Sequence, residues 1–196
     1  MGEAYPQPKD SIGKMEKTSF EDSAWFALQT RYRYEERIAT ELHTKGFESY
    51  LPTLREVHNW NDRKKAMNVP AFGGYLFARF EPSLHNRVRI LETTGVVKLL
   101  GNHGVPEPIS CKEIESLRLA LQSGMPCSRQ RYVEVGTPVR VCRGPLSGLE
   151  GKVLRMGNKL TVFVNVASVC QSIAVEVPIE YLDLGDGIKE TPILLN

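Results

Sequence analysis

The sequence predicts an α+β protein in two parts: an antiparallel sheet with helices packed on it, followed by a small SH3-like β-barrel. Between residues 25 and 123, short apolar runs alternate with segments of helical periodicity. Residues 134–185 instead contain only short strand-like segments with glycine at the bends. The polar stretch MPCSRQRYV separates the two patterns, and we expect a linker over residues 124–133.

The first part begins with the apolar strand AWFALQT, which contains Trp25. A helix is expected next, because Tyr34, Ile38 and Leu42 recur on one helical face and Gly46 suits a left-handed end. The following strands are expected to form a long β-hairpin with the basic bend NDRKK at its tip.

Residues 73–80, GGYLFARF, form the clearest strand of the first part, with apolar side chains on both of its faces. A second helix is expected over residues 82–95, with Leu84, Val88 and Leu91 aligned as its apolar stripe. The strand GVVKLLG follows. A third helix is expected over residues 110–124, opened by a capping box. We expect the helices to cover one face of the sheet.

In the second part, valines on alternate positions predict strands and disfavour helix. Gly144-Pro145 ends the first of these strands at a corner. The expected strands are 138–142, 151–156, 159–166, 172–177 and a short one near 179–184. Short strands of this kind close most economically into a barrel, which we expect to be permanent.

Composition excludes several classes of function. The 196 residues carry 25 basic and 23 acidic side chains, so the net charge is +2, and any nucleic-acid contact must be local. The cysteines and histidines are dispersed, which predicts no metal site, no cofactor and reduced thiols in a cytoplasmic protein. There is no apolar run of about 18 residues that would span a membrane. Catalytic motifs are absent, so we expect no enzyme.

Composition also predicts the character of the two terminal segments. Residues 1–24 have no apolar signal-peptide core and are expected to be a disordered leader, and residues 186–196 a tail. The domains expected between them are 25–123 and 134–185. A monomer is expected.

Four segments together resemble the NusG family of transcription elongation factors. WFALQT, AFGGYLFARF and VRILETTGVVKLLG with PEPIS are similar to its N-terminal (NGN) domain, and GTPVRVCRGPLSGLEGKVL is similar to its KOW motif. The hairpin EVHNWNDRKKAMNVPAFGGY looks more like the specialised antiterminators of the family, each dedicated to a particular operon. The resemblance covers nearly all of residues 25–184.

The resemblance implies a non-enzymatic factor that binds bacterial RNA polymerase across its cleft, from the clamp helices to the gate loop. Such a factor reduces pausing and promotes processive transcription, and it lies beside the non-template DNA strand. The KOW barrel of housekeeping members binds ribosomal protein S10 or the termination factor Rho. The alternative function is a ribosome- or RNA-associated KOW binding module without effect on elongation.

The family's docking aromatics on the clamp helices correspond to Phe72, Tyr75 and Phe77, for which packing in the core is the alternative. The gate-loop contact corresponds to Asn86 and Arg87, at what is otherwise a solvated helix start. In the barrel, the resemblance places partner-binding loops at Leu146, Leu149 and Val169. The phenylalanines of the housekeeping factor are absent from both loops, which leaves S10 and Rho binding open.

Two basic clusters are candidate nucleic-acid contacts. Arg31, Tyr32, Arg33 and Arg37 interleave guanidinium groups with an aromatic ring, as single-strand binding requires, and family members use this surface against the non-template strand. Neighbouring glutamates also allow a merely solvated helix. The hairpin tip carries a second cluster, which consists of Arg63, Lys64 and Lys65. A charged tip equally keeps a hairpin soluble.

Overall fold

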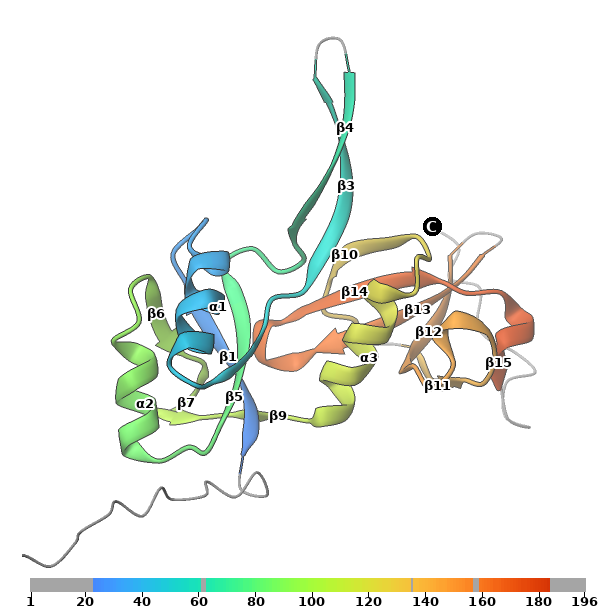
Figure 1. The fold of residues 1–196 in the computed structure, drawn as a ribbon. Helices are drawn as coiled ribbons and strands as arrows, with labels where there is room; N and C mark the ends of the chain where they lie inside the picture. Colours follow the sequence, from blue (N-terminus) through green and yellow to red (C-terminus); the bar gives the residue numbers. More distant parts are fainter. Residues whose placement is uncertain (1–22, 61–62, 135, 157–158, 184–196) are drawn as a thin grey trace, which may run out of the picture.

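The computed structural model describes residues 23–60, 63–134, 136–156 and 159–183 (Figure 1). Most of the predicted leader, the predicted tail and the hairpin bend at Asn61 and Asp62 lie outside the described residues. The first part of the chain contains β1 (Ala24–Thr30), α1 (Glu35–Thr44), β2 (Glu48–Tyr50), β3 (Thr53–Trp60), β4 (Arg63–Pro70), β5 (Tyr75–Phe80), α2 (Leu84–Leu91), β6 (Val96–Leu99), β7 (Gly101–Asn102), β8 (Val105–Pro106), β9 (Pro108–Ile109) and α3 (Cys111–Gln122).

The first part is built on an antiparallel sheet in the order β2-β5-β1-β6, with β9 also paired to β1. Its central strand β1 is apolar on both faces, because the sheet is covered on both sides. Phe26 and Leu28 point to one face, where they join Ile38 and Leu42 of α1 in a buried cluster. Helix α1 packs on β2 and β5, and α2 packs on β6.

The opposite face of this sheet carries Trp25, Ala27 and Phe77, which belong to a second buried cluster. That cluster includes Leu117 of α3 and Val169 of the barrel. The expectation that all helices cover one face is therefore wrong for α3. The barrel and α3 together cover the face that α1 and α2 leave open, because apolar side chains of β1 and β5 alternate to both sides.

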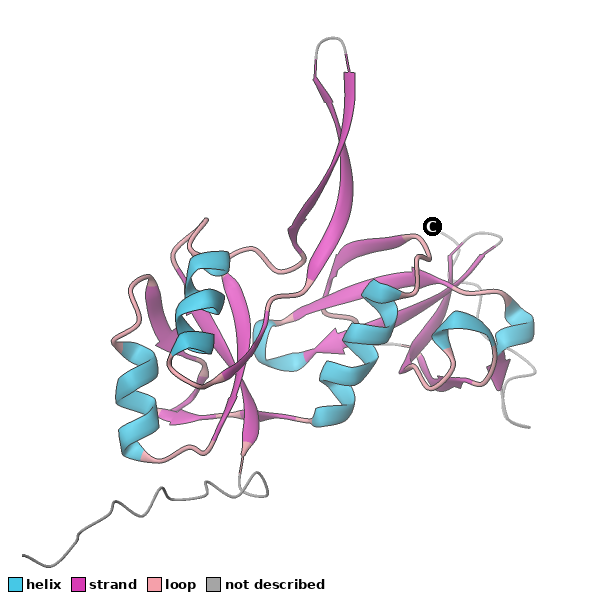
Figure 2. Ribbon diagram, viewed as in Figure 1, coloured by secondary structure: helices cyan, strands magenta, loops and turns pink. Residues whose placement is uncertain are grey.

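The second part contains β10 (Cys127–Arg131), β11 (Thr137–Val141), β12 (Glu150–Met156), β13 (Lys159–Val166), β14 (Gln171–Glu176) and β15 (Leu182–Asp183). These strands form one antiparallel sheet in the order β10-β14-β13-β12-β11-β15, which gives the predicted β-barrel region (Figure 2). Turns of 3-10 helix lie at Gly144–Leu146, Ala167–Val169 and Ile179–Tyr181.

Strand β10 lies inside the segment expected as a linker. Residues Cys127 to Arg131 pair with β14 from Val175 to Gln171. The polar character of this segment reflects an edge strand, since most of its side chains are exposed while its backbone groups pair with β14. A free connection between the two parts is thus absent over these residues, and α3 leads almost directly into the barrel sheet.

Helix α3 lies between the two parts of the molecule (Figure 1) and packs on β12, β13 and β14. Its capping box is as predicted: the Ser110 side chain accepts from Lys112 N, and the Glu113 carboxylate accepts from Ser110 N. On the barrel side, Ser116 Oγ accepts a hydrogen bond of 3.1 Å from Glu150 N. The helix therefore holds the barrel against the sheet.

Helix α2 differs from the sequence-based expectation in the direction of its apolar stripe. Leu84, Val88 and Leu91 are 75%, 44% and 43% exposed, and Ile90 is the residue of this helix that enters the core. Helix α2 packs on the edge strand β6, and Ile90 is its buried side chain. Periodicity identified the helix correctly but assigned the wrong side to the interior.

The β3–β4 hairpin projects from the body of the molecule as a separate two-stranded ribbon (Figure 1). At its base, Leu54 is buried and Glu56 forms an ion pair of 2.8 Å with Arg129 of β10. Further out, Val57 is 61% exposed.

None of the helices in the described part of the chain combines the length and apolar character that a membrane crossing requires.

Candidate functional site

A basic and aromatic surface surrounds the start of α1. Arg31, Arg33 and Arg37 are exposed, and the Tyr32 ring is 73% exposed. The Arg33 guanidinium lies 5.5 Å from the centroid of the Tyr32 ring. Arg33 also has a φ of 68°, a left-handed conformation that non-glycine residues adopt rarely. The structure thus brings the four predicted nucleic-acid residues onto one accessible loop and helix start.

Hydrogen bonds hold this loop against the turns that precede β5 and β6. Glu35 is 2% exposed, and its Oε1 accepts a bond of 2.8 Å from the backbone N–H of Gly74. Thr30 N donates to Gly74 O at 2.8 Å, and Arg31 N donates to Gly95 O at 2.8 Å. Sequence reasoning missed the role of Glu35, since a glutamate among arginines is the pattern of a solvated helix.

The predicted aromatic patch follows this turn, but it is not exposed. Phe72 and Phe77 are completely buried and pack edge to face at 6.1 Å, while Tyr75 is half-buried. Both phenylalanines belong to the cluster that continues through α3 into the barrel. For Phe72 and Phe77 the structure shows the core packing that was the alternative, because the barrel and α3 occupy the same sheet face, and docking on polymerase stays a prediction.

One arginine of α3 fastens that helix to the sheet. The Arg118 guanidinium lies 5.1 Å from the Trp25 ring centroid and 4.9 Å from that of Tyr50, and it bonds Glu48 at 3.2 Å. Burial raises the pKa of Tyr50 to about 12, with the Arg118 charge acting in the opposite direction. The phenol is therefore neutral at physiological pH and offers its ring face to the cation.

The two residues predicted at the gate-loop contact are held by intramolecular bonds. Asn86 Nδ2 donates to Glu81 O at 3.1 Å, and its backbone N–H donates to the Ser83 cap at 3.4 Å. Arg87 donates to Gly104 O at 2.6 Å. Both side chains are half-buried. Both residues belong to α2, whereas the loop at Tyr32 precedes α1.

The hairpin cluster lies at the far end of the ribbon. Arg63, Lys64 and Lys65 open β4, and Lys65 is exposed. The side chains of Arg63 and Lys64 lie outside the described part of the structure. This cluster is separate from the loop at Tyr32, so the two basic clusters form two surfaces and not one.

The predicted partner-binding residues of the barrel are also buried. Leu146 and Leu149 are 0% exposed and Val169 is 7% exposed. The turn that contains Leu146 packs against α3. In this arrangement α3 and the sheet face cover these side chains, and the binding of a second partner there stays a prediction.

These surfaces consist of basic and aromatic side chains. No group of three or more His, Cys, Asp or Glu side chains among the described residues could hold a metal ion. What the geometry offers is an exposed cationic and aromatic surface at Tyr32, next to an aromatic turn that the barrel covers. The fold is that of a two-part protein in which a β-rich C-terminal part packs on an α+β body.

Comparison with known proteins gives the family. The family model described as "Transcription termination factor nusG" matches residues 23–118. The transcription termination/antitermination protein NusG of Streptococcus pyogenes serotype M3 is 24% identical over 159 residues, which cover 74% of this chain and 88% of that protein. The Haemophilus influenzae protein of the same name is 25% identical over 150 residues, which cover 70% and 80%.

Residues 23–118 therefore form a NusG-family (NGN) domain, a β-rich region follows it, and the relatives that the chain resembles are transcription termination/antitermination factors. Among solved structures, NusG of Thermotoga maritima aligns with 83% of this chain and 97% of its own, at 17% identity and a TM-score of 0.47.

Proposed function

We propose that this protein is a transcription elongation and antitermination factor that binds bacterial RNA polymerase across its cleft, reduces pausing and serves a particular operon. In this proposal the turn of Phe72, Tyr75 and Phe77 docks on the clamp helices, and Asn86 and Arg87 face the gate loop. The observation that carries the proposal is the accessible surface of Arg31, Tyr32, Arg33 and Arg37 beside that turn.

The basic surface suits the single DNA strand that transcription exposes. Guanidinium groups bind phosphates, and the Tyr32 ring offers a face for a base, which contributes about 1–3 kcal/mol per stacked base in other proteins. The ties from Glu35 and Thr30 to Gly74 couple the DNA surface to the docking turn. A factor seated on the clamp would thereby place Tyr32 at a defined position relative to the DNA.

Docking also requires the barrel to leave the sheet. Phe72 and Phe77 are buried in the cluster shared with the barrel, so a partner reaches them only after α3 and the barrel move away. The same movement would free Leu146, Leu149 and Val169 for a second partner, for which ribosomal protein S10 and Rho are the proposed choices. The pairs between the parts, such as Arg129–Glu56, are partly exposed and oppose separation weakly.

The experiment is a pause-lifetime assay with purified bacterial polymerase on a template from the protein's own operon. The full chain is compared with Tyr75→Ala and with Tyr32→Ala. The wild type should shorten pauses, Tyr75→Ala should require a higher concentration, and Tyr32→Ala should bind polymerase but shorten pauses less. Both changes are at side chains that are at least partly exposed, so the fold is retained.

The matched control is Tyr132→Ala, since Tyr132 is 37% exposed and lies after β10, outside both surfaces. This variant should behave as wild type. If the wild-type chain leaves pausing unchanged at saturating concentration, the elongation function is wrong and the alternative of a ribosome- or RNA-associated binding module takes its place.

A further inference from the structure

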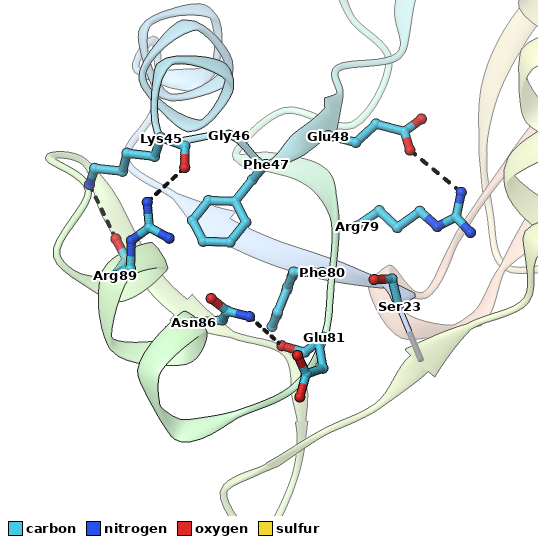
Figure 3. A pocket seen from close by; sticks show the side chains of 10 residues that line it. All are labelled: Ser23, Lys45, Gly46, Phe47, Glu48, Arg79, Phe80, Glu81, Asn86 and Arg89. Atoms are coloured by element: carbon cyan, nitrogen blue, oxygen red, sulfur yellow. Dashed lines mark hydrogen bonds and ion pairs between the residues drawn. The ribbon is translucent and has the colours of Figure 1, made fainter. Parts of the chain in front are cut away.

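A pocket of about 580 Å³ lies at the edge of the N-terminal sheet formed by β2 and β5 (Figure 3). It opens between the end of α1, the strands β2 and β5 and the start of α2. Its walls include Phe47, Phe80, Arg79, Arg89 and Asn86. A pocket of this size with an apolar lining and a few polar groups is the usual form of a binding site.

Two phenylalanines form the apolar part of the pocket. Phe47 and Phe80 are 7% and 3% exposed, and their rings meet edge to face at 6.2 Å. The Arg89 guanidinium lies 4.8 Å from the Phe47 ring centroid. These flat surfaces are rigid because both rings belong to the buried cluster under α1 and α2. They fit another aromatic or large apolar side chain.

The Arg89 side chain is fixed by reciprocal bonds with Lys45 (Figure 3). Arg89 donates to Lys45 O at 2.7 Å, and Lys45 Nζ donates to Arg89 O at 3.1 Å. Lys45 Nζ also contacts Thr93 Oγ1 at 2.7 Å and Glu41 at 3.0 Å. Lys45 therefore uses its three donors within the protein, and it serves as a frame for the pocket.

Arg79, on the other wall, retains unused donors. Its NH1 lies 3.6 Å from Glu48, beyond a good hydrogen bond, and the same carboxylate binds Arg118 at 3.2 Å. The Nε atom of Arg79 is buried and has no hydrogen-bond partner among the described residues. Two guanidinium groups thus share one carboxylate, which leaves positive charge at Arg79 for an anion.

We propose that this pocket binds a short acidic peptide segment of a partner protein. An aromatic or large apolar side chain of the segment packs on Phe47 and Phe80, and a neighbouring carboxylate binds Arg79. A peptide is favoured over a simple anion because the opposite wall presents acceptors. Asn86 Nδ2 donates to the backbone carbonyl of Glu81, which leaves the Asn86 amide oxygen as an acceptor for a peptide N–H group, and Glu81 also lines the pocket.

The apolar part of the site is separate from the proposed clamp-docking turn, and Asn86 is the residue that the pocket shares with the proposed gate-loop contact. Phe47 and Phe80 belong to the cluster on the helix-covered face, whereas Phe72 and Phe77 belong to the cluster under the barrel. The pocket is thus open while the barrel remains in place. Its test needs no polymerase, so a failure here leaves the proposed elongation function untouched.

The test titrates the ¹⁵N-labelled full chain with the capped peptide Glu-Phe-Glu and follows amide shifts by NMR. Shifts should concentrate at Phe47, Phe80 and Glu81. The capped peptides Gln-Phe-Gln and Glu-Ala-Glu should each bind at least about tenfold more weakly, because each lacks one of the two contacts. Equal binding of all three peptides, or no shift at these residues at millimolar peptide, overturns the proposal.

Arg79→Gln should weaken Glu-Phe-Glu about tenfold and leave Gln-Phe-Gln unchanged. Arg55→Gln is the matched control. Arg55 is exposed on the hairpin, so this substitution removes the same charge at a position away from the pocket. Arg79→Lys keeps the charge and should lie between wild type and Arg79→Gln. A loss of binding that is equal for Arg79→Gln and Arg55→Gln contradicts a specific carboxylate contact.

A second occupant is distinguishable in the full chain. Phe20, Glu21 and Asp22 precede Ser23, which lines the pocket, and they carry the same chemistry as the probe. With a partner segment as ligand, Phe20→Ala should bind Glu-Phe-Glu as wild type does. Binding that becomes fivefold or more tighter in Phe20→Ala would assign the pocket to the chain itself and overturn the proposed partner.

Discussion

The two faces of the N-terminal sheet are buried by different means. The face of Phe26 and Leu28 is covered by α1 and α2, which directly follow β1 and β5 in the sequence. The face of Trp25 and Phe77 is covered by α3 and the barrel, which come later in the chain. Ion pairs with partly exposed side chains, such as Arg118–Glu48, lie at the second contact.

This difference separates a core formed by local connections from a contact that opens in the function proposed above. The helix-covered face is closed by helices that directly follow its own strands, so we expect it to separate only when the sheet unfolds. The barrel-covered face is closed by a part of the chain with its own antiparallel sheet, so each part keeps its hydrogen bonds when they separate. The following predictions test this difference, from the largest effect to the smallest.

Leu76→Ala should lower the free energy of unfolding by about 2–5 kcal/mol, because Leu76 is completely buried on the helix-covered face. The matched control is Leu84→Ala on α2, where the side chain is 75% exposed and the change should stay within about 0.5 kcal/mol. Urea denaturation followed by circular dichroism measures both. Equal effects would mean that the apolar stripe of α2 is buried in solution.

Arg118→Gln should lower the free energy of unfolding by about 1–2 kcal/mol, since it removes two cation–π contacts and an ion pair that is partly screened by solvent. It should also accelerate hydrogen exchange in α3 while leaving exchange in α1 unchanged. Arg140→Gln, on an exposed barrel position, is the control and should alter neither quantity. Uniform acceleration in both helices would contradict a local role in holding α3.

The Arg129–Glu56 pair should show a coupling energy of about 0.2–1 kcal/mol in a double-mutant cycle. Both side chains are partly exposed, at 43% and 38%, so the coupling should decrease as salt rises from 0.05 to about 0.5 M. The cycle uses Arg129→Ala, Glu56→Ala and the double variant, with thermal unfolding as the readout. A coupling that salt leaves unchanged would indicate a more buried contact between hairpin and barrel.

The thiol of Cys127 should react most slowly among the four cysteines. Its Sγ contacts Ala120 O and Met125 O at 3.3 Å, and burial raises its pKa from 9.0 to about 11. Cys111, Cys142 and Cys170 are exposed. Reaction with a chromogenic disulfide at pH 8 should give a fast phase and a slow phase, and Cys127→Ser should remove the slow one.

The same shift has a consequence for stability. Because the folded-state pKa is raised, the protonated thiol stabilises the fold below pH 9 and that contribution is lost as pH rises from about 9 to 11. The effect is small. It is measured as the difference in the free energy of unfolding between wild type and Cys127→Ser across this pH range. A slow phase that persists in Cys127→Ser would assign the protected thiol elsewhere.

Sequence patterns predicted the elements of this fold better than their surroundings. The alternation of β1 and β5 and the capping box of α3 are local features, and the structure contains both. The burial of Glu35 depends on Gly74, which is 39 positions away, so no local pattern could indicate it. The exposure of Leu84 likewise depends on where α2 lies relative to the sheet.

The sequence by itself determined the α+β body, the β-rich second part, the resemblance to the NusG family and the basic, aromatic loop at Tyr32. The tertiary structure alone decided that Phe72, Phe77 and Val169 share one buried cluster, that Cys127 to Arg131 pair with β14, and that Phe47 and Phe80 line a pocket. Hydrophobic periodicity records that a side chain prefers burial, but it does not record which partner provides it. That choice depends on contacts between residues far apart in the chain.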